Sequence, residues 1–172
     1  DPAAEKGLDQ VKTIVAGVYN PHRFLEILRD YVYFPDRDYS KEEEIVCRYP
    51  QFFATRMLRE SVLNAFLEGD SKGGTYFGAT GCGKTYTMMF LARQLSLRCR
   101  PLGSPTIVMI VDRDDLQSQA GKLFLRSEDF LSLGAAKVIA NREELKREMS
   151  LRESGGFFIC TIQKFCEEIG EL

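Results

Sequence analysis

The sequence predicts an α/β fold with a mainly parallel sheet flanked by helices, preceded by a helical N-terminal segment. From about residue 45 onward, short apolar runs typical of buried strands alternate with amphipathic helical stretches. A glycine-rich octet also stands between one such strand and one such helix. The length of 172 residues and the hydrophobic content of 44% suit one domain, or one domain with an appendage.

Residues 1–44 are expected to form a helical linker segment. Asn20 and Pro21 supply an N-cap and a first-turn proline for a helix with one apolar face. The end of the segment is charged and rich in turn-forming residues, which is typical of a linker. We therefore expect the α/β domain to occupy residues 45–172.

The α/β domain is predicted to open with a helix at 52–67, which stops at Gly69. The elements expected after it are strand 75–77, helix 85–97, strand 106–111, helix 114–124, strand 137–140, helix 142–149 and strand 157–161. Because the run 106–111 is continuously apolar, we expect a parallel strand covered on both faces. Asn141 and Glu144 are expected to form a capping-box-like start to the helix at 142–149.

The octet Gly78–Thr85 fits the phosphate-binding pattern G-x-x-x-x-G-K-[ST] at every fixed position. Its glycines let successive backbone N–H groups approach phosphate oxygens, and the positive end of the following helix faces the same anion. Lys84 is the predicted catalytic cation that reaches the β- and γ-phosphates, and the Thr85 hydroxyl is expected to hold Mg²⁺. The expected phosphate contacts are Gly78, Thr80, Gly81, Cys82, Gly83, Lys84 and Thr85. The alternative is a glycine-rich turn that happens to precede a helix.

Composition excludes several other classes of protein. A net charge of −2 gives no global electrostatic case for nucleic-acid binding. No apolar run approaches the length of a membrane span, so no membrane partner is expected. The five cysteines form an odd count without C-x-x-C spacing, which favours neither a disulfide framework nor a zinc site. These features are typical of a cytoplasmic protein with reduced thiols.

Four stretches carry a resemblance to a known family: 48–54, the octet, 111–119 and 161–165. In this order they resemble the motor subunit of type I restriction endonucleases, a superfamily 2 helicase-like translocase built on RecA-like domains. The phosphate loop alone is widespread, whereas Val-Asp-Arg-x-Asp-Leu followed by Thr-Ile-Gln-Lys-Phe is far more specific. The resemblance implies an ATP-driven translocase of double-stranded DNA, which works with methylation and specificity subunits in a restriction complex.

The resemblance also implies roles for individual residues. Gln51 corresponds to a glutamine that reads the adenine of ATP, since a side-chain amide both donates and accepts hydrogen bonds. The positions that the resemblance assigns to the DNA backbone are Arg113, Gln119, Thr161, Gln163 and Lys164. For Gln51 the structural alternative is a surface glutamine that opens a helix. For Arg113 and Gln119 it is an ordinary helix cap with surface polar residues. For Thr161, Gln163 and Lys164 it is a strand-to-helix turn.

Motors of this family carry an acidic Asp-Glu segment after Thr-Ile-Gln-Lys-Phe, a second RecA-like domain with arginines, and an upstream nuclease. We find none of these in the sequence, so we expect the N-terminal part of a first motor domain that hydrolyses ATP negligibly on its own. We also expect an exposed apolar edge on its sheet. Other functions stay open: a P-loop phosphotransferase acting on a small molecule, another nucleic-acid helicase, or a nucleotide-gated interaction module without turnover.

Overall fold

The computed structural model describes residues 2–35, 43–111, 119–132, 134 and 136–162. The chain divides into two compact units between Cys47 and Arg48. Within the described ranges, no helix is both long enough and apolar enough to cross a lipid bilayer.

The first unit combines two helices with a small antiparallel sheet. Its elements are α1 (Pro2–Gly17), α2 (Pro21–Asp30), β1 (Val32–Tyr33) and β2 (Ile45–Val46). The start of α2 confirms the predicted cap, because the Asn20 side chain accepts the backbone N–H of Arg23 at 3.3 Å. Pairing of Tyr33 with Ile45 shows that the segment expected to be helical contains a short strand, β1, which pairs with a second short strand just after residue 44.

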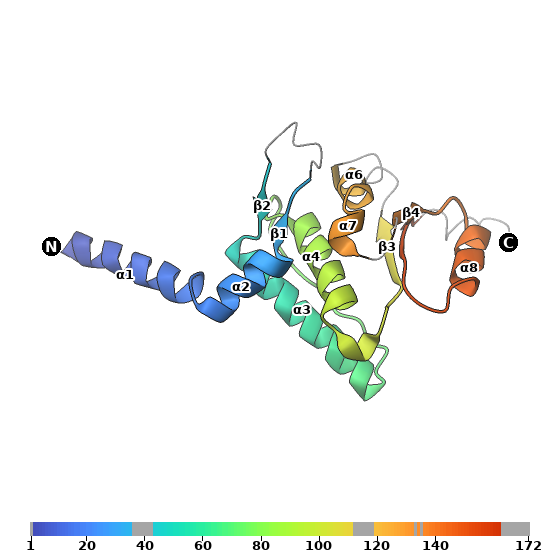
Figure 1. Cartoon of the computed structure of the whole chain (residues 1–172), viewed down its shortest axis with the longest axis horizontal. Helices are drawn as coiled ribbons and strands as arrows, with labels where there is room; N and C mark the ends of the chain where they lie inside the picture. Colours follow the sequence, from blue (N-terminus) through green and yellow to red (C-terminus); the bar gives the residue numbers. More distant parts are fainter. Residues whose placement is uncertain (1, 36–42, 112–118, 133, 135, 163–172) are drawn as a thin grey trace. The chain divides into compact units, whose positions relative to one another are not determined.

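The second unit alternates helices and strands, as the sequence predicts (Figure 1). Its helices are α3 (Tyr49–Glu68), α4 (Lys84–Leu97), the 3₁₀ turn η1 (Arg100–Leu102), α6 (Gln119–Leu125), α7 (Glu128–Leu131) and α8 (Arg142–Ser150). Its strands are β3 (Ile107–Val111), β4 (Ala136–Val138) and β5 (Phe157–Thr161). The three strands form a parallel sheet in the order β3-β5-β4, so a parallel α/β architecture is confirmed.

The central strand of the sheet, β5, is buried along its whole length. The buried cluster beneath α8 consists of Ile139, Leu145, Phe158 and Cys160. On the opposite face Phe157 stacks on Phe124 of α6, with ring centroids 5.3 Å apart. Helices therefore cover both faces of the sheet in a three-layer arrangement.

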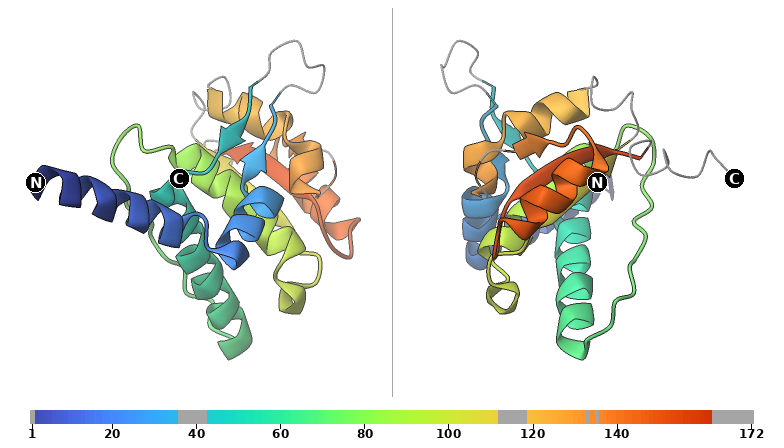
Figure 2. Two further views of the ribbon diagram at one scale, coloured as in Figure 1. Left: turned by 60° about the vertical axis from the view of Figure 1, so that its left-hand side comes forward. Right: turned by 90° about the vertical axis from the view of Figure 1, so that its right-hand side faces the viewer.

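The strand predicted at 75–77 does not form. The segment is an extended loop that runs back past α3 (Figure 2), and the side chain of Phe77 is 92% exposed. A strand needs a neighbour to satisfy its backbone N–H and C=O groups, and no described strand pairs with this segment. The β-rich composition of the segment was therefore insufficient to make it part of the sheet.

Strand β3 forms where the sequence predicts it, but it is not covered on both sides. Among the described strands it pairs with β5 alone, and the side chain of Ile110 is 55% exposed. A pocket of about 270 Å³ follows this edge, lined by successive residues of β3 and by Met88, Leu91 and Leu95 of α4. This edge matches the exposed apolar sheet edge expected from the sequence.

Smaller shifts occur at the ends of other elements. Strand β4 ends at Val138, before the predicted limit, and the N–H of Ala140 donates instead to the Glu144 carboxylate at 2.7 Å. The cap of α8 is formed as predicted on one side, since the Asn141 side chain accepts the N–H of Glu144 at 2.8 Å. The reciprocal bond goes to Ala140 rather than to Asn141, so the motif is a variant of the capping box.

Candidate functional site

The glycine-rich octet lies at the start of α4, and two of its glycines adopt backbone conformations that favour glycine. Gly81 has φ of 78° and Gly83, the N-cap of α4, has φ of 82°. Both values lie in the left-handed region, where a Cβ atom would clash with the backbone. Residues 78–83 of the octet thus form a tight turn directly before the first helical residue, Lys84.

The side chain of Lys84 folds back onto the loop that precedes it. Its Nζ donates hydrogen bonds to the carbonyl oxygens of Gly78 at 2.8 Å and Ala79 at 3.1 Å. The N–H of Cys82 donates to the same Ala79 oxygen at 3.2 Å, which closes the turn around the ammonium. An ammonium has three donors, so Lys84 can hold the loop and still offer a hydrogen bond to an anion.

The N-terminus of α4 has the features of an anion site. Gly83 has no side chain and therefore cannot cap the first N–H groups of the helix, which lack intrahelical acceptors. Those N–H groups and the helix dipole favour a negative charge at this point. Thr85 lies in the first turn of α4 and is half-buried. Lys84 and Thr85 thus provide an ammonium and a hydroxyl at this helix end. An ammonium can pair with phosphate oxygens, and a hydroxyl oxygen can be a ligand of the Mg²⁺ that accompanies a triphosphate.

Gln51 connects the octet to α3. Its side chain is in the first turn of α3 and is almost fully buried, with 4% exposed. Its Oε1 accepts the backbone N–H of Arg48 at 2.7 Å, and its Nε2 donates to the Gly83 carbonyl oxygen at 3.1 Å. The carbonyl oxygen of Cys82 lies 3.5 Å from the same nitrogen. Gln51 is therefore not a surface residue, and its amide binds the backbone at both ends.

Helices α3 and α4 are joined at a second polar contact. Arg59 of α3 donates to the Oε1 atom of Gln94 at 2.8 Å, and Gln94 is fully buried. Nothing in the spacing of the sequence indicates this pair, or the contact between Gln51 and Gly83, because each joins residues more than 30 positions apart. Both contacts were missed by sequence reasoning.

The start of α4, which carries the end of the octet, lies at the end of the sheet where the strands have their carboxyl termini. In Figure 1 the chain descends through α4 to η1 and then rises through β3, so the start of α4 and the end of β3 face the same side. Strand β5 is parallel to β3, with Val111 opposite Thr161. The two family-specific stretches, 111–119 and 161–165, therefore leave adjacent strands at the edge where parallel sheets place ligand sites.

Only part of the set assigned to the DNA backbone falls on described residues. Thr161 ends β5 with 3% of its surface exposed. Gln119 is the first residue of α6, and its side chain is outside the description. Arg113, Gln163 and Lys164 lie outside the described residues.

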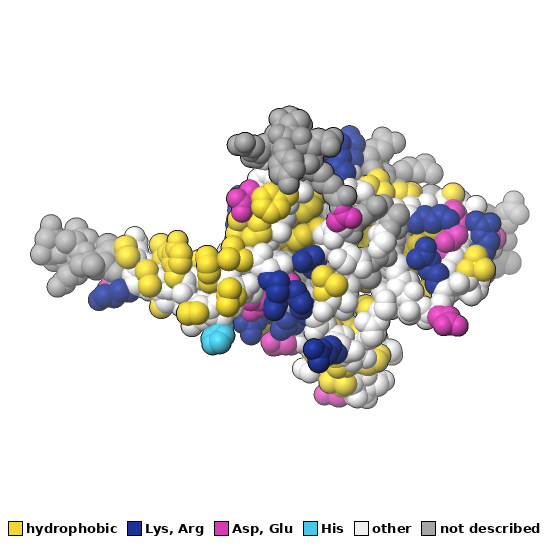
Figure 3. Space-filling model, viewed as in Figure 1, with side chains coloured by type: hydrophobic (Ala, Val, Ile, Leu, Met, Phe, Trp, Pro, Cys, Tyr) yellow, Lys and Arg dark blue, Asp and Glu magenta, His cyan; other side chains and the backbone are white. Residues whose placement is uncertain are grey.

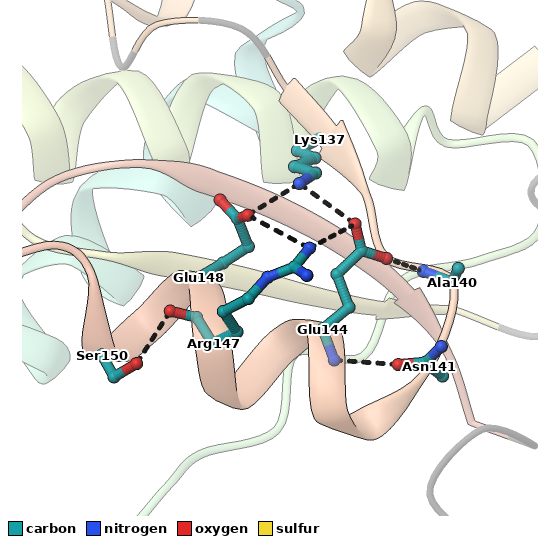
Figure 4. A network of polar contacts seen from close by, with 7 residues as sticks. All are labelled: Lys137, Ala140, Asn141, Glu144, Arg147, Glu148 and Ser150. Carbon is teal, nitrogen blue, oxygen red and sulfur yellow. Dashed lines mark hydrogen bonds and ion pairs between the residues drawn. The ribbon is translucent and has the colours of Figure 1, made fainter.

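A group of paired charges lies between β4 and α8 (Figure 4). Lys137 contacts Glu148 at 2.8 Å and Glu144 at 3.0 Å, and Arg147 lies 4.0 Å from both carboxylates. Basic and acidic side chains alternate over α8 in the space-filling view (Figure 3).

These contacts shift the pKa values of the charges between β4 and α8. The N–H of Ala140, followed by Lys137, lowers the pKa of Glu144, and the hydrogen bond from Lys137 lowers that of Glu148. The same carboxylates raise the pKa of Lys137. The ammonium of Lys137 is thus held by two carboxylates, as expected of a structural contact.

The described part of the chain has no site at which protein side chains alone would coordinate a metal ion. It contains no group of three or more His, Cys, Asp or Glu side chains arranged to hold a metal ion. The Mg²⁺ expected from the sequence would instead have to be held by the Thr85 hydroxyl together with phosphate oxygens and water.

Comparison with known proteins gives a consistent result. Residues 50–171 match the family model described as SWI2/SNF2 ATPase. The chain is 30% identical over 158 residues to the type I restriction enzyme HindI endonuclease subunit of Haemophilus influenzae, covering 91% of this chain and 15% of that protein. It is 31% identical over 172 residues to the putative type I restriction enzyme MjaVIIP endonuclease subunit of Methanocaldococcus jannaschii, covering 92% and 16%. The chain thus spans about a sixth of the length of these curated relatives.

Proposed function

The chain belongs to the SWI2/SNF2 ATPase family, and on that basis we propose that residues 78–85 bind the phosphates of ATP together with Mg²⁺. The observation that carries the proposal is the geometry of Lys84. Its ammonium is folded over the glycine loop at the uncapped start of α4. A cation, open helix N–H groups and two left-handed glycines at one point form a phosphate cradle.

Each residue of the loop has a proposed task. The backbone N–H groups of Gly81, Gly83, Lys84 and Thr85 hold the phosphate oxygens, and Lys84 neutralises charge on the β- and γ-phosphates. The Thr85 hydroxyl holds Mg²⁺, which supplies charge neutralisation at the phosphates when it is bound. Gly78, Thr80 and Cys82 shape the turn that brings these groups together. Binding is expected to loosen the contacts of Lys84 with the Gly78 and Ala79 carbonyls, since phosphate oxygens compete for the same ammonium.

The longer protein that contains these residues is proposed to be an ATP-driven translocase of double-stranded DNA in a type I restriction complex. The similarity to two restriction endonuclease subunits supports this proposal. Its partners would be the methylation and specificity subunits of such a complex, and its place of action the cytoplasm. Turnover is assigned to the longer protein, and the 172 residues alone are expected to bind ATP with negligible hydrolysis.

DNA contact is proposed at the carboxyl edge of β3 and β5. The alignment of Val111 with Thr161 supports it, because the first residues of the two family-specific stretches lie opposite each other on adjacent parallel strands. Polar side chains at such an edge can bind phosphates without reading base sequence. The residues proposed for this contact are Arg113, Gln119, Thr161, Gln163 and Lys164. For Thr161, contact would require its buried hydroxyl to become accessible.

The test is ATP turnover by the longer protein, with and without long double-stranded DNA. We expect duplex DNA to stimulate turnover, and Lys84→Ala to lower the stimulated rate by about 10²-fold or more, as for other lost charge-stabilising donors. Lys72→Ala is the matched control, since Lys72 lies on the surface of the same loop region and pairs only weakly with Asp70 at 3.4 Å. Turnover indifferent to DNA would contradict the translocase, and full turnover by Lys84→Ala would contradict the assigned loop.

A further inference from the structure

The amide of Gln51 is positioned to control the orientation of the phosphate loop. Its nitrogen lies 3.1 Å from the Gly83 carbonyl oxygen and 3.5 Å from that of Cys82. Its oxygen is engaged by the N–H of Arg48 at 2.7 Å, which fixes the plane of the amide. With 4% of its surface exposed, the side chain has little freedom to choose other partners.

Both carbonyl groups near the amide belong to peptide units that also carry loop N–H groups. In a planar trans peptide the C=O and the N–H of the next residue point in opposite directions. When the carbonyls of Cys82 and Gly83 face Gln51, the N–H groups of Gly83 and Lys84 must therefore point away from α3. Those N–H groups stand at the start of α4, where an anion is favoured.

The Gly83 carbonyl is also the first acceptor of α4. It receives the N–H of Thr87 at 3.2 Å and the Thr87 hydroxyl at 3.4 Å. Gln51 thus adds a donor to the carbonyl that begins the helix, and so ties the start of α3 to the start of α4. Together with the contact between Arg59 and Gln94, it fixes one helix against the other at two points.

We propose that Gln51 is a positioning residue that holds the N–H groups of Gly83 and Lys84 toward the phosphates of the nucleotide. This proposal rests on the proposed function, because it assigns Gln51 to the same phosphate site. It differs from the adenine-reading role that the sequence resemblance implies for Gln51. A residue that orients the loop affects every ligand with a phosphate chain, whereas a residue that reads adenine affects only ligands with that base.

The experiment compares Mg²⁺ complexes of ATP, GTP and inorganic tripolyphosphate, which has no base, by calorimetric titration of the chain. The main variant is Gln51→Glu, which keeps an acceptor for Arg48 but loses the donor and sets a negative charge against two carbonyls. Gln51→Asn is the second variant, because it keeps the amide but is too short to span the gap. Arg59→Ala is the matched control, since it removes another polar contact between the two helices and lies outside the loop.

We expect both Gln51 variants to weaken all three ligands by a similar factor of about tenfold or more, as for a lost hydrogen bond in a charged site. Arg59→Ala should leave the three affinities close to those of the wild type. A loss confined to ATP, with tripolyphosphate unchanged, would overturn the proposal in favour of adenine reading. Unchanged affinities for all three ligands would overturn it as well. If the wild-type chain bound none of the three, the proposed function would fall and this proposal with it.

Discussion

The side-chain nitrogen of Gln51 lies 3.1 Å from the carbonyl oxygen of Gly83, which follows it by 32 positions in the chain. The contact joins the first turn of α3 to the N-cap of α4. It depends on glycine at position 83 for two reasons. The backbone there has φ of 82°, and a Cβ atom would lie 2.3 Å from the Gln51 nitrogen. The glycine-rich loop is thus fitted to a residue outside it.

Gly83→Ala should therefore destabilise the chain more than Gly81→Ala does. Gly81 has a similar φ of 78°, but a Cβ atom there would meet no atom within 4 Å. Gly81→Ala is expected to cost about 1–2 kcal/mol from the left-handed conformation alone. Gly83→Ala carries the same strain and also displaces Gln51. Urea unfolding of the two variants measures the difference, and equal losses would show that the contact contributes nothing.

Two cysteines should differ sharply in reactivity. Burial, with a contribution from Glu26, raises the pKa of the Cys47 thiol to about 12, so its thiolate fraction at pH 8 is roughly 10⁻⁴. Both cysteines are partly exposed, and Cys82 lies in the loop. Iodoacetamide at pH 8 should modify Cys82 well before Cys47, and Mg²⁺·ATP should protect Cys82. Peptide mass spectrometry follows each site, and rapid labelling of Cys47 would contradict the prediction.

The charges between β4 and α8 predict an acid-sensitive contribution to stability. The pKa of Glu144 is lowered in the folded state by the Ala140 N–H and then by Lys137. A lowered folded pKa stabilises the fold above the unfolded value of about 4.5, and the contribution disappears as pH falls through the folded value. Glu144→Gln should therefore be less stable than the wild type at pH 7, with the gap closing in acid.

Chemical unfolding at a series of pH values measures the gap between Glu144→Gln and the wild type. Glu143→Gln is the control, since Glu143 lies on the exposed side of the same helical turn. If the difference in unfolding free energy between Glu144→Gln and the wild type stayed constant at low pH, protonation of Glu144 would not be coupled to folding.

Because the loop at 75–77 is exposed, substitutions of its apolar residues should change the stability of the fold very little. Phe77 is 92% exposed, so Phe77→Ala should change the free energy of unfolding by no more than about 0.5 kcal/mol. Phe158 is 1% exposed in the cluster beneath α8, and Phe158→Ala should cost about 3–5 kcal/mol. Thermal or urea unfolding of the two variants checks the contrast. A large loss for Phe77→Ala would mean that this segment is packed as the strand first predicted.

Local signals were enough to predict the elements that depend on local chemistry. Asn20 and Asn141 mark helix starts because a short polar side chain caps N–H groups within its own turn. The apolar runs of β3 and β5 identify strands because the strands of a parallel sheet carry mostly apolar side chains, although only β5 is buried along its whole length. The octet could be matched to a phosphate-binding pattern because the fixed residues of that pattern lie within eight consecutive positions, and its role stays a prediction.

Features that depend on distant partners could not be predicted in the same way. The segment 75–77 has the composition of a strand, but its state depends on a neighbouring strand that composition cannot identify. The exposure of Ile110 follows from what covers its face of β3 rather than from the sequence of the strand. The contact of Gln51 with Gly83 requires the packing of α3 on α4, and no spacing rule connects residues so far apart.

The most direct test of the central claim is a titration of the 172-residue chain with Mg²⁺·ATP. We expect saturable binding by the wild type and by Lys72→Ala, and binding by Lys84→Ala that is weaker by about tenfold or more, as for a lost charged hydrogen bond. Circular dichroism confirms that the variants stay folded. Equal affinity of Lys84→Ala and the wild type would contradict the assignment of the loop as a phosphate site.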